Sequence, residues 1–181
     1  ETVLKNNKNI YYSVSATTRS PREGEKEGIN YYFLSKEEFQ KLIANQGMLE
    51  HACFCDNFYG TPRKQVEEKL REGYDVILEI ETNGAMQIKK NFPDAILIFI
   101  LPPSVSELRR RLFKRRTETE EVIEKRLSEA KYEISLARNY DYIMINAELE
   151  KAISDFEAII AASKLTNKKN SNKIEEVLNN A

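Results

Sequence analysis

The chain has 181 residues, of which 41% are hydrophobic and 31% charged, the composition of a globular protein with one good hydrophobic core. Its 28 lysines and arginines against 29 aspartates and glutamates give a formal net charge of −1, which excludes a protein that coats nucleic acid through a basic excess. No apolar run approaches the ~20 residues of a membrane span, no signal peptide is visible, and two cysteines are too few for a disulfide framework, so a cytoplasmic protein is expected.

The first part of the chain mixes short strand patterns with two clear helix patterns. Ser35 followed three residues later by Glu38 is the pattern of a capping box, and it predicts a helix that closes at Gly47. A second helix is expected between Pro62 and Gly73, because proline is favoured at a helix start and glycine just after its end. The other expected elements are a helix end over 1–7 and strands over 9–16, 29–35 and 48–61.

From residue 75 onward, apolar strand patterns alternate with helix patterns. Nearly continuous apolar runs are typical of strands buried on both faces, and strand–helix alternation is typical of a parallel α/β sheet. The polar tail, residues 166–181, is expected to fray. Strands are expected over 75–81, 95–103 and 140–146, and helices over 83–93, 104–116, 117–140 and 149–165.

The loop of residues 15–25, SATTRSPREGE, sets Arg19 and Arg22 on either side of Pro21. Proline fixes its own backbone and restricts Ser20 before it, so this turn is stiffer than its neighbours. Two guanidinium groups on a stiff turn suit a phosphate, because each donates paired charge-assisted hydrogen bonds. A solvated loop with exposed arginines is the alternative.

Carboxylates that suit a nucleotide occur at two further places. Glu79 and Glu81 end a buried strand, at the sheet edge where ligands bind in parallel folds, and one of them could hold a magnesium-bound water; a charged strand end is the alternative. Glu50 could accept from the two adjacent N–H groups at one edge of guanine, and Thr61 could donate to a carbonyl there.

Tyrosines and a second group of arginines complete the candidates. Tyr31 and Tyr59 could donate to phosphate, or they are ordinary half-buried tyrosines. Arg111 and Arg115 share one helix face and Arg126 lies on the following helix, so all three could neutralise a polyphosphate; solvated helix faces are the alternative.

A metal interpretation of His51, Cys53 and Cys55 is disfavoured. Alternate residues of an extended strand lie about 6.6 Å apart, so these side chains would have to converge sharply on one zinc ion. Small core cysteines are the preferred interpretation.

Several motifs in one order resemble a single family. They are YSVSATTRSPREGE, INYYFLS, LEHACFCDNFYGTP, DVILEIE, FILPPS, RLFKRRTETEE and EKRLSEA. Over about residues 1–165 the chain resembles guanylate kinase, which transfers a phosphoryl group from ATP to GMP. The resemblance implies the P-loop nucleoside monophosphate kinase fold: a parallel sheet core flanked by helices (1–15 and 75–181), an inserted GMP-binding lobe (16–74) and a helical lid (104–126).

The resemblance also implies roles for individual residues. Glu25 falls at the family's acidic position after the paired arginines, and Asn146 at a position near adenine. The GMP phosphate would be held by Arg19, Arg22, Tyr31 and Tyr59, and the base read by Ser15, Glu50, Thr61 and Glu81. Arg111, Arg115 and Arg126 would approach the transferring phosphates, and Glu79 would face Mg²⁺ through water. The implied partners are GMP and ATP, without nucleic acid or membrane; a homo-oligomer stays open.

Three departures from the family pattern stand out. Glu81 occupies a position where the family has aspartate, and Arg116 a position where it has glycine. No G-x-x-x-x-G-K-[ST] motif occurs in these 181 residues, which are therefore expected to be inactive on their own, with that motif directly upstream. The alternative function is a non-catalytic guanylate-kinase-like module that binds phosphopeptides.

Overall fold

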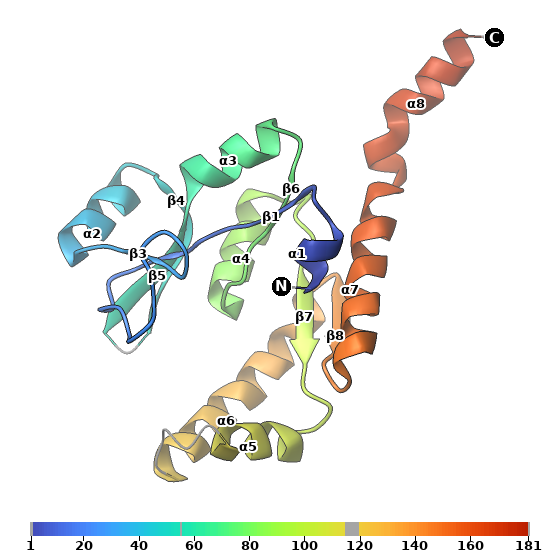
Figure 1. Ribbon diagram of the computed structural model, residues 1–181. Coiled ribbons are helices and arrows are strands. Elements are labelled where there is room, and N and C mark those ends of the chain that lie inside the picture. Colours follow the sequence, from blue (N-terminus) through green and yellow to red (C-terminus); the bar gives the residue numbers. More distant parts are fainter. Residues whose placement is uncertain (1, 55, 115–119, 181) are drawn as a thin grey trace. The chain divides into compact units, whose positions relative to one another are not determined.

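The computed structural model describes residues 2–54, 56–114 and 120–180, and the chain divides into two compact units, residues 1–95 and 96–181 (Figure 1). The first unit contains two small sheets. Its strands are β1 (Ile10–Tyr12), β2 (Ala16–Thr17), β3 (Tyr32–Phe33), β4 (Met48–Phe54), β5 (Asn57–Pro62) and β6 (Asp75–Ile77). Its helices are α1 (Thr2–Asn6), α2 (Lys36–Ala44), α3 (Arg63–Arg71) and α4 (Thr82–Asn91).

The strands of the first unit pair in two directions. β1 and β6 form a parallel pair, with Tyr12 opposite Ile77. The second sheet has the order β3-β2-β5-β4, in which β5 is antiparallel to both β2 and β4. β2 and β3 instead pair in parallel, because the long loop between them returns the chain in the same direction.

Local signals explain the helix ends of this unit. Ser35 Oγ accepts from the Glu38 N–H at 3.1 Å and Glu38 Oε2 accepts from the Ser35 N–H at 2.8 Å, so the predicted capping box is confirmed. α3 follows Pro62, which is its N-cap rather than its first helical residue. Gly73 follows α3 with φ of +86°, a conformation that favours glycine after a helix end.

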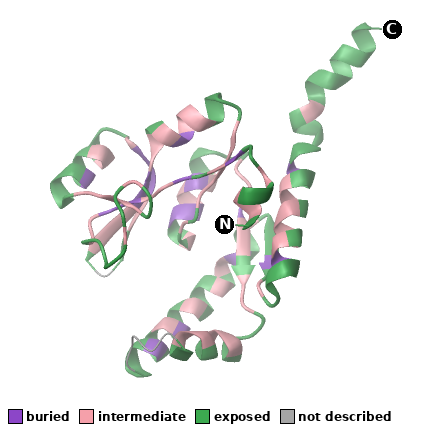
Figure 2. Cartoon of the chain, viewed as in Figure 1, coloured by how far each residue is buried: buried purple, intermediate pink, exposed green. Residues whose placement is uncertain are grey.

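Strand β4 separates two apolar clusters. Met48 packs with Ala16 and Phe39 on one side. Leu49, which lies at the register shift between Met48 and Glu50, packs with Val66 of α3 and Ile88 of α4 on the other. Figure 2 shows buried residues on β4, β5 and α4. The position of β4 is therefore fixed from both faces.

A glutamine side chain fixes the outer edge of the same strand. Gln87 of α4 accepts from the His51 N–H at 3.2 Å and donates to the His51 carbonyl at 2.8 Å. The side-chain amide thus replaces a neighbouring strand for one residue of the β4 edge. This pair of hydrogen bonds holds the first turns of α4 against the middle of β4.

The second unit contains one parallel strand pair and its helices. Its elements are β7 (Ile98–Leu101), α5 (Val105–Lys114), α6 (Glu120–Leu136), η1 (Ala137–Asn139), β8 (Tyr142–Ile145), α7 (Leu149–Lys164) and α8 (Asn167–Asn179). Leu101 pairs with Ile145, and the Asp141 carboxylate accepts from the Leu97 N–H at 2.8 Å. Arg109 joins α5 to α6 through Glu124 at 2.5 Å.

The tail differs from the expectation. Residues 166–181 were expected to fray, but Asn167–Asn179 form α8, which has no buried residue. Over residues 2–54, 56–114 and 120–180, no helix is both long enough and apolar enough to cross a membrane.

The cluster around Phe39 yields a first prediction. Phe39 is fully buried and stacks on Phe58 with ring centroids 5.5 Å apart. Phe39→Ala removes a buried ring and leaves a cavity, so the free energy of unfolding in urea should fall by about 3–5 kcal/mol.

Ile29→Ala serves as the control, because Ile29 is 65% exposed in the same unit. It should change the free energy of unfolding by less than about 0.5 kcal/mol. Equal stability of the two variants would contradict the assignment of Phe39 to the core.

Candidate functional site

The guanidinium of Arg19 is held in one place by its own loop. It donates to Glu25 Oε1 at 2.9 Å and to the Ser20 carbonyl at 2.6 Å. Its carbon lies 5.5 Å from the centre of the Tyr31 ring and 6.0 Å from that of Phe33, within the range of cation–π contacts. Because the side chain is only 17% exposed, the charge is presented from a fixed position.

Glu25 closes the loop that carries both arginines. Its second oxygen accepts from the Arg22 backbone N–H at 2.7 Å. The hydrogen bond from Arg19, and after it the one from the Arg22 backbone, lowers the pKa of Glu25. The structure thus places Arg19 beside aromatic rings, whereas the Arg22 side chain is exposed. Glu25 therefore joins the Arg19 guanidinium to the Arg22 backbone rather than to the Arg22 side chain.

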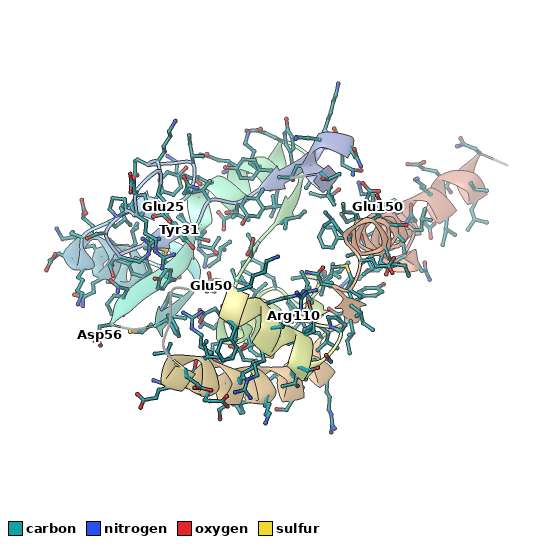
Figure 3. The ribbon with its side chains drawn as sticks, turned by 60° about the horizontal axis from the view of Figure 1, so that its bottom comes forward. Glu25, Tyr31, Glu50, Asp56, Arg110 and Glu150 are labelled. Atoms are coloured by element: carbon teal, nitrogen blue, oxygen red, sulfur yellow. The ribbon has the colours of Figure 1, made fainter. Side chains whose placement is uncertain are left out.

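Two tyrosines lie next to the Arg19 guanidinium. Tyr31, directly before β3, and Tyr59 of β5 meet edge to face with ring centroids 6.2 Å apart. Burial raises the pKa of Tyr31, as does the nearby Tyr59, while Arg19 opposes the shift. A hydrogen bond with Glu25, followed by weaker contributions that include Tyr59, raises the pKa of Arg19. Figure 3 labels Glu25 and Tyr31 of this group. The ring contacts of Tyr31 with Arg19 and with Tyr59 bring a fixed cation and two phenol groups together.

A buried carboxylate lies further along the same sheet. Glu50 of β4 is paired with Thr61 of β5, and the Thr61 hydroxyl donates to Glu50 Oε1 at 2.7 Å. Glu50 is 5% exposed, and burial raises the pKa of this carboxyl; Thr61 opposes the shift. The hydroxyl proton of Thr61 is therefore directed at Glu50 and is not available to a ligand. The sequence did not predict this pairing of Thr61 with Glu50.

Gly84 admits this carboxylate to the first turn of α4. A Cβ atom at Gly84 would overlap Glu50 Oε2 and lie 3.0 Å from Glu50 Cδ. Sequence reasoning missed this residue. The available signal was a glycine inside a helix, which costs about 1 kcal/mol relative to alanine and therefore suggests a packing reason.

The two carboxylates that follow β6 have different surroundings. Glu79 is exposed, and its Oε2 accepts from the Tyr12 hydroxyl at 2.7 Å. Glu81 is the N-cap residue of α4 without a side-chain cap, and its charge contributes to the raised pKa of Glu50. Ser15 is half-buried just before β2, and its carbonyl accepts from the Tyr32 N–H at 2.9 Å.

The remaining candidates belong to the second unit. Arg111 donates to Glu107 Oε1 at 2.8 Å and to the Asn146 carbonyl at 3.0 Å, so two predicted site residues are joined directly. Hydrogen bonds from Arg110 and Arg111 lower the pKa of Glu107 to about 2. Arg126 is half-buried on α6. Arg115, with Arg116, lies outside the described residues.

Cys53 does not lie where the sequence suggested. Cys53 was expected in the core but is exposed, because it lies near the end of β4, beyond the part packed from both faces. Cys55 lies outside the described residues. Among the described residues, no group of three or more His, Cys, Asp and Glu side chains is arranged to hold a metal ion.

Comparison with known proteins gives one consistent result. The family model described as guanylate kinase matches residues 1–163. A guanylate kinase of Carboxydothermus hydrogenoformans is 49% identical over 167 residues, which are 92% of this chain and 82% of the relative. A guanylate kinase of Bacillus anthracis is 52% identical over 149 residues, or 82% of this chain and 73% of the relative. The crystal structure of guanylate kinase from Anaplasma phagocytophilum matches with a TM-score of 0.76 and 38% identity, over 91% of this chain and 82% of that chain.

The burial of Glu50 predicts a specific pH dependence. A carboxyl whose pKa is raised on folding stabilises the protein below its unfolded value, near 4.5, and this contribution is lost as the pH rises through the folded value. The free energy of unfolding of the ligand-free protein, minus that of Glu50→Gln, should therefore decrease as the pH rises above 4.5.

Glu38→Gln is the matched control, because hydrogen bonds from Ser35 lower the pKa of Glu38. The same difference for that variant should change in the opposite direction, decreasing as the pH falls. Urea denaturation at several pH values measures both, and identical trends would contradict the burial of Glu50.

Proposed function

The chain belongs to the guanylate kinase family, and we propose that the Arg19 loop and the Glu50 pocket are the two ends of its GMP site. The fold is that of the P-loop nucleoside monophosphate kinases, and the activity is phosphoryl transfer from ATP to GMP, giving ADP and GDP for purine nucleotide metabolism. The relatives named above are guanylate kinases, which favours this enzyme over a phosphopeptide-binding module.

One observation carries the proposal. Within the first unit, a fixed cation with tyrosine hydroxyls and a buried carboxylate are set on the same small sheet, through β2, β4 and β5. A purine monophosphate needs both: charge neutralisation at the phosphate and a polar acceptor at the base. Residues 16–74 would accordingly form the GMP-binding lobe.

The phosphate end is assigned to Arg19, supported by Tyr31 and Tyr59. The guanidinium supplies charge-assisted hydrogen bonds, and the phenol groups donate single protons. Glu25 has a positioning role, because it fixes Arg19 by its side chain and Arg22 by its backbone. Arg22, whose side chain is exposed, would turn toward the phosphate when GMP binds.

The base end is assigned to Glu50. Its Oε2 lies against Gly84 and its Oε1 accepts from Thr61, and a carboxylate here can accept from the N1 hydrogen and 2-amino group of guanine. The Thr61 hydroxyl uses its proton in the hydrogen bond to Glu50, so toward a ligand its oxygen can act only as an acceptor. Ser15 and Glu81 are proposed as further base contacts; the longer Glu81 replaces the aspartate of the family pattern.

The donor side of the reaction involves ATP and, by our proposal, Mg²⁺. Glu79 suits a water-mediated role, since one oxygen accepts from Tyr12 and the side chain is exposed, and Mg²⁺ keeps several waters in such sites. When bound, Mg²⁺ would neutralise charge on the ATP phosphates. In the second unit, Arg111, Arg115 and Arg126 are proposed for the transferring phosphates, and Asn146 for adenine. Cytoplasmic location stays a prediction.

These groups act by positioning and by charge neutralisation. Arg19 and the tyrosines would orient the GMP phosphate, Glu50 would fix the base, and the arginines would stabilise the charge that spreads over the transferred group. No covalent intermediate on the protein is required.

The phosphate assignment predicts a loss of GMP affinity in Arg19→Ala. Removal of a charged donor from a half-buried site should cost about 1.5–3 kcal/mol of binding free energy, measured by isothermal titration of GMP. Arg138→Ala is the matched control, because Arg138 is exposed in the second unit. It should bind GMP as the unchanged protein does, and equal affinities for all three proteins would contradict the assignment.

The base assignment predicts a change of selectivity in Glu50→Gln. The glutamine amide can accept one N–H of guanine but presents a donor to the other, so GMP affinity should fall at least about tenfold. Inosine monophosphate lacks the 2-amino group and should lose less affinity. Titration of both nucleotides measures the ratio, and an unchanged ratio would remove Glu50 from base recognition.

A further inference from the structure

A helix side chain is bonded to the strand directly after Glu50. In the sheet order β3-β2-β5-β4, strand β4 lies at the edge, and its pairing with β5 shifts register between Met48 and Glu50. On the other edge of β4, the Gln87 amide of α4 accepts from the His51 N–H and donates to the His51 carbonyl. Regular strand pairing is therefore interrupted just before Glu50, and the Gln87 amide is attached just after it.

One of these hydrogen bonds acts on the backbone of Glu50 itself. The His51 N–H belongs to the peptide group whose carbonyl is that of Glu50, and a peptide group is planar. An acceptor on this N–H therefore also fixes the direction of the Glu50 carbonyl. That carbonyl faces β5, since a Cβ atom at Gly60 would lie 2.7 Å from its oxygen. The peptide group after Glu50 is thus held between Gly60 and the Gln87 amide.

The same helix provides the space for the Glu50 side chain. Gly84 and Gln87 are three residues apart in α4, so both lie on one face of the helix. The missing Cβ of Gly84 admits Glu50 Oε2, and less than one turn later Gln87 is bonded to the neighbouring backbone. Packing of Ile88 on Leu49 is apolar and without direction, so the two hydrogen bonds of Gln87 set the register of the helix on the strand.

This register matters for the number of hydrogen bonds that the Glu50 carboxylate can form with a base. Acceptance from both the N1 hydrogen and the 2-amino group of guanine needs the position and the plane of the carboxylate to be fixed, whereas a single hydrogen bond tolerates rotation. Inosine monophosphate offers only the N1 hydrogen at this edge. A displaced carboxylate would therefore weaken the binding of GMP more than that of inosine monophosphate.

We propose that Gln87 is a positioning residue for base selectivity. By bonding both backbone groups of His51, it fixes the adjoining Glu50 carboxylate, with Gly84 against it, in the orientation that reads the two N–H groups of guanine. The inference rests on the proposed role of Glu50 in base recognition. It assigns to Gln87 an effect on selectivity that needs no contact between Gln87 and the nucleotide and that requires the carboxylate of Glu50.

A double-mutant cycle in nucleotide selectivity tests the inference. Gln87→Met, which keeps the length of the side chain and removes both hydrogen bonds, is compared with Glu50→Gln and the double variant by calorimetric titration of GMP and of inosine monophosphate. Gln87→Met should lower the preference for GMP about three- to tenfold, the range of one net hydrogen bond. The double variant should show the same preference as Glu50→Gln.

The ratio of the two Kd values separates positioning from a general loss of structure. Partial unfolding weakens both nucleotides by the same factor and leaves the ratio unchanged. Gln87→Glu, which can still accept from the His51 N–H but has no proton for the carbonyl when ionised, should lower the ratio less than Gln87→Met, and it serves as the test if Gln87→Met does not fold. Gln40→Met, which changes an exposed glutamine of α2, is the matched control and should leave the ratio unchanged.

Two results would overturn the inference. The first is an unchanged ratio in the Gln87 variants that fold. The second is an equal fall in the ratio when Gln87→Met is introduced into Glu50→Gln, because the effect would then not pass through the carboxylate.

Glu50→Gln on its own distinguishes a failure of this inference from a failure of the proposed base site. An unchanged ratio in Glu50→Gln would overturn the base site itself. A lowered ratio in Glu50→Gln together with an unchanged ratio in Gln87→Met would overturn the role of Gln87 alone.

Discussion

The burial of the Glu50 carboxylate is the constraint on which the candidate GMP site depends. An ionisable group at 5% exposure is tolerated only where polar partners and close packing compensate for lost water. Thr61 supplies a hydrogen bond from β5, and Gly84 supplies the space in α4. Both require that β4 be held from its two faces and its edge, which Met48, Leu49 and the Gln87 amide accomplish.

The opposite end of the site follows a related rule. Two acidic side chains near it already have donors: Glu25 accepts from Arg19 and from the Arg22 backbone, and Glu79 accepts from Tyr12. Loose carboxylates would repel an incoming phosphate or occupy its cation. Because these acids are restrained, the fixed guanidinium of Arg19 and the hydroxyls of Tyr31 and Tyr59 define the local chemistry. In this view, acids near an anion site are acceptable when each of them is held by a donor.

Local structure was predictable where one or two residues decide it. The capping box at Ser35 and Glu38 and the glycine after α3 occur as expected, since their hydrogen bonds and backbone angles involve neighbours in the chain. The parallel direction of β8 with β7 also agrees with the strand–helix alternation from residue 75 onward. The expectation of a buried Cys53 is wrong, because burial depends on contacts that are distant in the chain, and the helix over Asn167–Asn179 was not expected.

The sequence by itself determined which residue types are available and in which order: paired arginines around a proline, acids after a buried strand, tyrosines and a threonine in a separate segment. It carried the family resemblance for the same reason, since motifs are local. Only the tertiary structure decided the pairings, namely Thr61 with Glu50, Glu50 with Gly84, and Tyr12 with Glu79. Those pairs join residues 11 to 67 positions apart, and strand register and packing, rather than local propensity, set their distances.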